Sequence, residues 1–176
     1  MENKLQISDM TLDCIRTNSG LMMNIFEPTL EMICIEDIAH ALANMPRFGC
    51  HLNRFYSVGQ HSIACARLVS KENKLAALLH DASEAYMLDI PTPIKNRLPD
   101  YKKYEHALML KIAEKFGFDY PLNKELKDAD RKMLETEWEA LVVNEKEHKN
   151  FVCWNSNETK QYFLESYYQL KSGLWG

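Results

Sequence analysis

Apolar residues recur at helical spacing along most of the chain. In the most apolar segment, Leu75, Leu78, Leu79 and Ala82 follow the i, i+3, i+4, i+7 rule, which places them on one face of a helix. Similar patterns and their start and stop signals predict about six helices. The predicted helices span residues 35–42, 57–69, 74–88, 100–116, about 122–149 and about 158–170.

The first 30 residues have a different pattern. Two short segments, 15–16 and 21–26, flank the turn-forming residues 17–20, which predicts a small β-hairpin. The expected fold class is therefore all-α, or nearly so, with a small N-terminal β-hairpin. A chain of 176 residues fits a single domain over 1–176, with the hairpin as an extension over residues 1–30.

Charge and hydropathy exclude several classes of protein. The chain has 21 Lys and Arg against 25 Asp and Glu, a net charge of −4, whereas gripping a nucleic-acid polymer needs a basic face. No stretch approaches the ~20 apolar residues of a membrane span, so no membrane partner is expected. No apolar run follows the first residues, so a secretory signal is not expected either.

The cysteines indicate a reducing compartment. They are five in number, widely spaced and without a CxxC pair, which matches neither a zinc ribbon nor a disulfide framework. We therefore expect small buried side chains or free thiols, and a cytoplasmic protein.

Candidate chemistry lies within the most apolar predicted helix. His80, Asp81 and Glu84 occur there, and a helix would direct all three side chains toward one side. Charged groups are rarely buried without a partner, and a divalent metal would suit imidazole and carboxylate donors. A partly exposed His–Asp pair at a helix edge is the alternative that this segment leaves open.

Motifs before and after this segment favour a metal site over an exposed His–Asp pair. His61 lies early in the preceding predicted helix, an Asp-Ile-Pro-Thr-Pro-Ile-Lys loop follows at residues 89–95, and a Lys-Asp-Ala-Asp run follows at residues 127–130. This order resembles the HD-domain metal-dependent phosphohydrolases, especially bacterial 5′-deoxynucleotidases of the YfbR type and related phage-encoded hydrolases. The resemblance covers about residues 35–135 and implies an HD-domain helical bundle with its catalytic core there.

The resemblance implies a site residue by residue. It assigns the metal ligands to His61, His80, Asp81 and Asp130, with Asp128 as the alternative to the last. It assigns catalytic roles at the water and the phosphate to Glu84 and Asp89.

The resemblance also implies substrate contacts. Arg47 and Phe48 match an Arg-Trp pair that holds the phosphate and packs on the sugar, although Phe replaces Trp and the spacing to His61 is one residue shorter. Lys95 is expected to help bind the phosphate. His51 is either a substrate contact or a structural hydrogen-bond partner.

The residue types suit phosphate ester hydrolysis. A metal ion polarises the phosphoryl oxygen and lowers the pKa of bound water, and an arginine binds the phosphate through two nitrogens. We expect one divalent ion, Mn, Co, Mg, Fe, Ni or Zn. The expected partner is a small nucleotide, and the HD-domain resemblance also implies a homo-oligomer, a dimer or larger.

The leading function is a 5′-deoxynucleotidase that hydrolyses a deoxynucleoside monophosphate. The alternative is a deoxynucleoside triphosphate triphosphohydrolase, which needs more cations, for which Arg54, Lys95 and Arg97 are candidates. A second alternative is a non-catalytic nucleotide-binding domain. The glutamate-rich runs at residues 135–139 and 145–149 are expected to be solvated helix faces.

Overall fold

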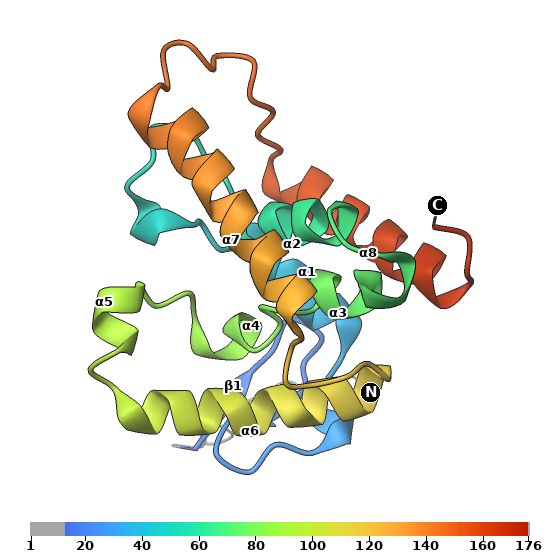
Figure 1. Ribbon diagram of the computed structural model, residues 1–176. Coiled ribbons are helices and arrows are strands. Elements are labelled where there is room, and N and C mark those ends of the chain that lie inside the picture. Colours follow the sequence, from blue (N-terminus) through green and yellow to red (C-terminus); the bar gives the residue numbers. More distant parts are fainter. Residues whose placement is uncertain (1–12, 176) are drawn as a thin grey trace, which may run out of the picture.

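A computed structural model describes residues 13–175, and these are mostly helical (Figure 1). The elements are, in chain order, β1 (Cys14–Arg16), β2 (Met22–Asn24), α1 (Ile35–Asn44), α2 (Val58–Arg67), α3 (Lys74–Leu78), α4 (Glu84–Met87), α5 (Thr92–Lys95), α6 (Pro99–Phe116), α7 (Lys124–Trp138) and α8 (Ser156–Lys171). The expected class, a helical fold with a small N-terminal hairpin, is confirmed. Residues 1–12 of the predicted extension lie outside the described residues.

The hairpin is fastened to the start of α1. Its two strands pair antiparallel with Ile15 opposite Met23, and Met23 is fully buried in the core. In the turn, the backbone N–H and the hydroxyl of Ser19 donate to the two carboxylate oxygens of Asp37, each at 2.6 Å. These hydrogen bonds hold a sheet that is too small to be stable alone.

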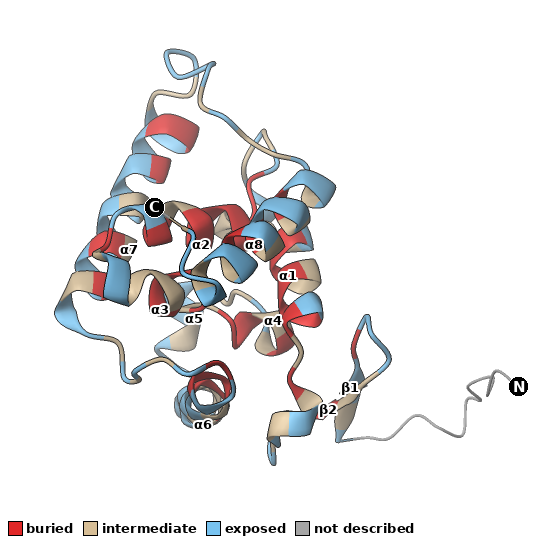
Figure 2. Ribbon diagram, turned by 90° about the vertical axis from the view of Figure 1, so that its right-hand side faces the viewer, coloured by how far each residue is buried: buried red, intermediate tan, exposed pale blue. Residues whose placement is uncertain are grey.

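Helices α1, α2 and α8 form the centre of the molecule, and their inner faces carry much of the buried surface in Figure 2. Helix α2 also contacts α3 and α7. Gly59 allows the close crossing, since a Cβ there would lie 3.2 Å from the Ala43 nitrogen and 3.0 Å from Thr159 Cγ2. This crossing places His61, two residues later, at the buried end of α2.

Four predicted helices are confirmed as α1, α2, α6 and α8, with ends shifted by at most two residues. Helix α2 begins at its predicted cap, because the Ser57 side chain accepts a hydrogen bond from the Gln60 N–H. Gly117 ends α6 in the left-handed conformation, with a φ of 77°. No helix among residues 13–175 is both long and apolar enough to cross a bilayer.

The predicted helix over residues 74–88 is wrong as a continuous element. It is divided into α3 and α4 by tight turns at residues 79–83, where hydrogen bonds run to the third residue back, as from Ala82 to Leu79 and from Glu84 to Asp81. Helical periodicity continues through such turns, so the sequence pattern did not mark the break. The break is where His80 and Asp81 lie.

The predicted helix over residues 122–149 is too long. It consists of α7 and a π-helical turn, Glu139–Val143, after which the chain leaves the helix axis. Charged residues continue beyond this point, but the apolar face of the helix does not. Such wide turns inside or at the end of helices are often found near functional sites.

Candidate metal centre and cleft

The structure brings together His61, His80, Asp81 and Asp130, the four residues predicted as metal ligands. His61 Nε2 lies 3.1 Å from Asp130 Oδ1 and 3.9 Å from Asp81 Oδ2. His80 Nε2 lies 3.1 Å from Asp81 Oδ2 and 3.8 Å from Asp130 Oδ1. Donors that each lie about 2.0–2.2 Å from one ion are themselves roughly 3–4 Å apart. These four atoms therefore have the spacing of one coordination sphere.

Both imidazole rings present Nε2 to this point. The Nδ1–H of His80 donates to the Ala77 carbonyl oxygen at 2.8 Å, while its buried Nε2 has no hydrogen-bond partner. His61 Nδ1 lies 2.7 Å from a carboxylate oxygen of Glu137, so Nδ1 carries the proton there as well. Two buried ring nitrogens that face two carboxylates fit a divalent cation, which would take the place of protons on Nε2.

Cys65 is a further donor that the sequence interpretation treated as an ordinary thiol. It lies one turn after His61 on α2, is buried, and has its Sγ 3.4 Å from His61 Nε2. Donor atoms of His61, Cys65, His80 and Asp130 all lie within 4.8 Å of one another. The i, i+4 spacing of His61 and Cys65 was the sequence signal for this proximity. All five cysteines are free.

The two aspartates of the Lys-Asp-Ala-Asp run face different ways. Asp130 faces the histidines, whereas Asp128 pairs with Lys124 on the surface of α7 and lies away from the histidine pair. Asp130 is therefore the aspartate that the fold brings to the cluster, and the alternative, Asp128, is not.

The metal-free cluster balances its charges with protons. Burial lowers the pKa of His80, but Asp81 and Asp130 outweigh it and hold that pKa well above its usual range. Burial raises the pKa of Asp81, and the charge of His80 brings it down to about 2. Carboxylates are thus ionised beside protonated imidazoles, and a divalent cation could replace these protons.

The predicted catalytic carboxyl groups, Glu84 and Asp89, lie beside the cluster in a different electrostatic state. Burial raises the pKa of Glu84 to about 9, and the nearby Asp81 and Asp89 add to the shift. Glu84 Oε2 has no hydrogen-bond partner, and Lys95 Nζ lies 3.7 Å from Oε1. Burial also raises the pKa of Asp89. Glu84 is therefore protonated near neutral pH in the metal-free protein.

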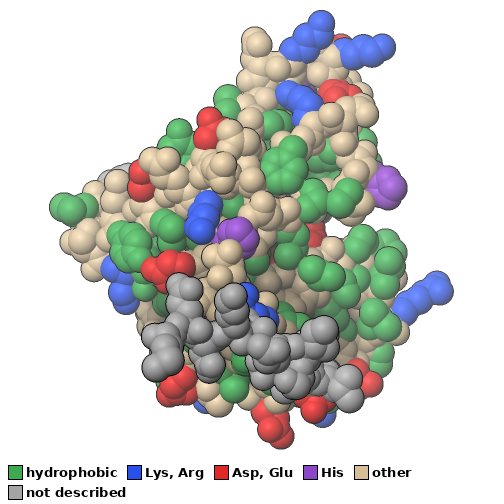
Figure 3. All heavy atoms as spheres, turned by 180° about the vertical axis from the view of Figure 1, so that it is seen from behind, with side chains coloured by type: hydrophobic (Ala, Val, Ile, Leu, Met, Phe, Trp, Pro, Cys, Tyr) green, Lys and Arg blue, Asp and Glu red, His purple; other side chains and the backbone are tan. Residues whose placement is uncertain are grey.

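All these groups adjoin one cleft of about 1030 Å³, a volume at the upper end of ligand pockets. Figure 3 shows the molecule hollowed at one edge, with hydrophobic side chains on both sides of the hollow. The predicted site residues that line the cleft are Arg47, Phe48, His51, Asp81, Glu84, Asp89, Lys95 and Asp130. His61 and His80 lie behind Asp81 and Asp130, buried in the protein.

The cations of the cleft are few. Among residues 13–175, Arg47 and Lys95 are the Lys and Arg side chains that line it, and Lys95 Nζ is 2.7 Å from Glu105 Oε1. Arg54 donates instead to backbone carbonyls, including that of Phe151 at 3.0 Å. Arg97 does not line the cleft. Two of the three cations considered for a triphosphate therefore lie elsewhere.

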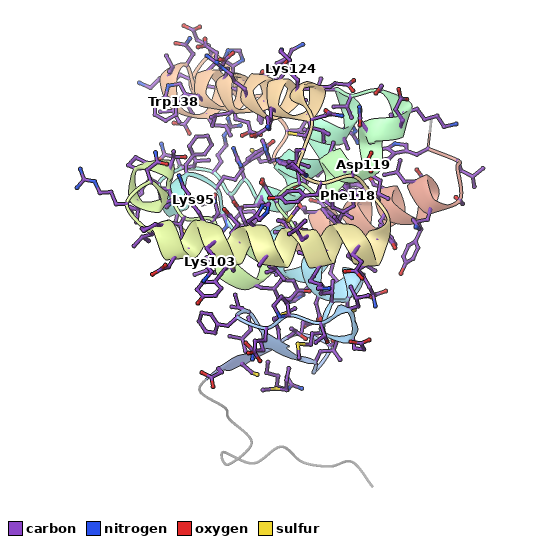
Figure 4. All side chains as sticks on the ribbon, turned by 60° about the horizontal axis from the view of Figure 1, so that its bottom comes forward. Lys95, Lys103, Phe118, Asp119, Lys124 and Trp138 are labelled. Atoms are coloured by element: carbon purple, nitrogen blue, oxygen red, sulfur yellow. The ribbon has the colours of Figure 1, made fainter. Side chains whose placement is uncertain are left out.

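One wall of the cleft is aromatic and apolar. Trp138 lies at the far end of α7 from Lys124, on the same side of the molecule as Lys95 of α5 (Figure 4). It lines the cleft with Leu134 and Val142 and is half exposed. The sequence interpretation missed Trp138, although its position eight residues after Asp130 places it near the same helix face.

The expectation that residues 135–139 form a solvated helix face is wrong at Glu137. This side chain has no exposed surface and contacts Arg47, Tyr56 and His61. Glu137 follows Asp130 by seven residues, which is two helical turns, and this spacing was the signal that could have found it.

An unusual turn presents Arg47 and Phe48 to the cleft. Phe48, Gly49 and Cys50 all have positive φ, at 55°, 59° and 68°. The turn is fixed at its base, where the Arg47 N–H donates to the Tyr56 carbonyl oxygen at 2.9 Å. Non-glycine residues hold such backbone angles when the surrounding structure imposes them, often at functional sites. No pattern in the sequence predicted this turn.

Comparison with known proteins finds similar chains in two bacteria. It is 45% identical over 131 residues to the uncharacterized protein YfdR of Escherichia coli strain K12, covering 74% of each chain. The chain belongs to the YfdR family. It is also 32% identical over 141 residues to the uncharacterized protein RCAP_rcc00048 of Rhodobacter capsulatus, covering 72% of each. No model of a known protein family matches the chain. Both relatives are uncharacterized proteins, so the geometry of the site is what bears on function.

Proposed function

We propose that this protein is a divalent-metal-dependent phosphohydrolase of the HD-domain type. Its proposed substrate is a deoxynucleoside 5′-monophosphate, hydrolysed to the deoxynucleoside and phosphate. The observation that carries this proposal is the convergence of His61, His80, Asp81 and Asp130 beside one cleft. Motifs far apart in the sequence thus lie at one place, in the order that the HD-domain resemblance implies.

The donor set defines the chemistry. A divalent ion bound there would polarise a phosphoryl oxygen and lower the pKa of bound water. Nitrogen and oxygen donors suit Mn, Fe, Co, Ni, Zn or Mg. The residues that would hold the ion are His61, His80, Asp81 and Asp130.

The other polar residues that line the cleft can each be assigned a role in this reaction. Arg47 would bind and orient the phosphate with its guanidinium, which lines the cleft. Glu84 and Asp89 would orient the attacking water and protonate the leaving 5′-oxygen, since both lie beside the donor cluster and have raised pKa values. Lys95 would add positive charge at the far side of the phosphate.

The cleft favours a monophosphate over a triphosphate. Arg47 and Lys95 are its two cationic side chains among residues 13–175, and Glu105 already neutralises part of the charge of Lys95. A triphosphate carries more negative charge than these groups balance. The apolar wall formed by Phe48, Leu134 and Trp138 suits the sugar and base of a nucleotide.

A product assay tests the proposal. Protein stripped of metal with EDTA receives Mn²⁺, Co²⁺, Mg²⁺ or Zn²⁺ in turn, with deoxynucleoside and ribonucleoside mono- and triphosphates. We expect nucleoside and orthophosphate from deoxynucleoside monophosphates. Release of tripolyphosphate would instead establish the triphosphohydrolase, and no product with any metal would refute an enzymatic function of this kind.

Two variants tie the activity to the site. His80→Ala should abolish both metal binding and turnover. Glu84→Ala should retain the metal and lose most of the turnover, since Glu84 adjoins the donor cluster without belonging to it. Loss of the metal from Glu84→Ala would reassign Glu84 as a ligand.

A further inference from the structure

We propose that Glu137 is a positioning residue that links the metal centre to the anion-binding arginine. One of its carboxylate oxygens contacts His61 and the other contacts Arg47. This inference rests on the proposed function, because it takes His61 as a metal ligand and Arg47 as a phosphate-binding group.

The burial of Glu137 requires an explanation. The side chain has no exposed surface, although it lies on α7 among residues that are mostly exposed. An ionised carboxylate is expensive to remove from water unless several donors compensate it. Tyr56 and His61 donate hydrogen bonds to it and Arg47 forms an ion pair with it, so two of its three partners belong to the candidate site.

One oxygen fixes the histidine. Oε1 accepts from His61 Nδ1 at 2.7 Å and from the Tyr56 hydroxyl at 2.9 Å. A carboxylate accepts only, so this contact puts the proton of the neutral ring on Nδ1 and leaves the Nε2 lone pair for a metal. Such a carboxylate also makes the imidazole a better donor. The Tyr56 hydroxyl prevents Oε1 from turning away.

The other oxygen fixes the arginine. Oε2 forms an ion pair with Arg47 Nε at 3.0 Å, and the Arg47 side chain is nearly buried. Contact through Nε leaves the two terminal nitrogens of the guanidinium for a ligand. Arg47 lies in extended backbone, with a φ of −75°, just before the positive-φ turn, so no helix directs its side chain. The Glu137 carboxylate therefore sets the distance between anion site and metal site.

The test uses binding of simple ions, measured without turnover. Mn²⁺ affinity is measured by titration calorimetry, and affinity for inorganic phosphate is measured on the Mn²⁺-loaded protein. Glu137→Gln keeps the shape of the side chain but removes its charge. We expect Mn²⁺ to bind about 10- to 100-fold more weakly, as for the loss of an outer carboxylate. Phosphate should bind about tenfold more weakly or worse, because Arg47 loses its ionic partner.

Controls separate positioning from stability. Glu139→Gln removes an exposed charge two residues further along, so both affinities should stay as in the wild type. Glu137→Asp keeps the charge and should recover part of the Mn²⁺ affinity. Thermal unfolding shows whether each variant is folded at the temperature of the titration. A folded Glu137→Gln protein with wild-type affinity for both ions would overturn the proposal.

A second variant keeps the proposal testable if Glu137→Gln does not fold. Tyr56→Phe retains the packing but removes one donor to Oε1, so Mn²⁺ affinity should fall about three- to tenfold. Unchanged Mn²⁺ affinity in Tyr56→Phe would then overturn it. Inactivity toward nucleotides with intact ion binding would refute the proposed function and leave the role of Glu137 standing.

Discussion

The rings of Phe48 and Trp138 lie with their centroids 5.9 Å apart and their planes tilted by 44°, and both line the cleft. They come from distant parts of the chain, Phe48 from the strained turn before α2 and Trp138 from the end of α7. Trp138 is half exposed, so its indole face is available to a ligand. The pair forms an aromatic wall on which a nucleobase can stack.

Removal of the indole should weaken binding of the base alone. Base stacking on an aromatic side chain contributes ~1–3 kcal/mol, so Trp138→Ala should raise the KM for a deoxynucleoside monophosphate about tenfold. Hydrolysis of 2-deoxyribose 5-phosphate, which has no base, should be unchanged, and Trp138→Phe should keep most of the affinity. Equal effects on both substrates would mean that Trp138 supports the site generally.

The two aspartates of α7, Asp128 and Asp130, provide a matched pair of variants for testing the metal centre. Asp130→Asn removes an oxygen that lies 3.1 Å from His61 Nε2, so Mn²⁺ affinity should fall by more than the ~10–100-fold of an outer group. Asp128→Asn removes an exposed partner of Lys124, and such surface ion pairs contribute little. Titration calorimetry of both variants checks this. A similar loss in both would place the metal elsewhere.

The raised pKa of Glu84 predicts how stability depends on pH. The folded metal-free protein keeps this proton up to about pH 9, whereas the unfolded chain loses it near the ordinary value of 4.5. Glu84 therefore lowers the stability progressively as the pH rises from 4.5 toward 9. Glu84→Gln stays neutral, so it should be more stable than the wild type by roughly 1–3 kcal/mol at pH 7.

Urea unfolding of the chelator-treated protein at pH 4 and pH 7 measures this difference. The two proteins should unfold at similar urea concentrations at pH 4 and diverge at pH 7. Glu135→Gln, a change at an exposed carboxylate, should have little effect at either pH. A Glu84→Gln protein that is less stable at pH 7 would show that Glu84 is ionised and paired with Lys95.

Periodicity and caps predicted the helices that pack on the core, because α1, α2, α6 and α8 each bury one regular apolar face. Periodicity failed where the chain departs from a helix without changing its apolar pattern. The turns at residues 79–83 are such a place, and they determine how His80 and Asp81 reach the cluster. Linked motifs were informative about the site, since each marked a residue that the fold brings to one cleft.

The supporting residues were harder to predict, because their roles depend on contacts between distant segments. In the sequence alone, Glu137 resembles the surface glutamates around it. Its contacts in the fold are Arg47, Tyr56 and His61, which lie 76 to 90 positions away. The role of Trp138 in the cleft likewise becomes apparent only from its contact with Phe48. Helical spacing from Asp130 offered a signal for both, but spacing alone does not show which helix face is buried.

Leu88 carries a backbone strain that a single substitution should relieve. Its φ of 70° and ψ of 153° fall in a region that essentially only glycine occupies, and its side chain is 64% exposed. The Leu88 N–H donates to the Glu84 carbonyl oxygen at 2.8 Å, and this hydrogen bond does not need the side chain. The conformation turns the chain out of α4 and directs the next residue, Asp89, to the cleft.

Leu88→Gly should therefore stabilise the protein by about 1 kcal/mol, the relief of strain less the extra entropy that glycine has when unfolded. Leu98→Gly is the matched control, because Leu98 is also exposed but has a φ of −119°. That control should lose about 1 kcal/mol. Urea unfolding of both variants measures the difference, and equal losses would mean that Leu88 is not strained. Activity should survive in Leu88→Gly, because glycine adopts the same backbone angles without strain and Asp89 keeps its position.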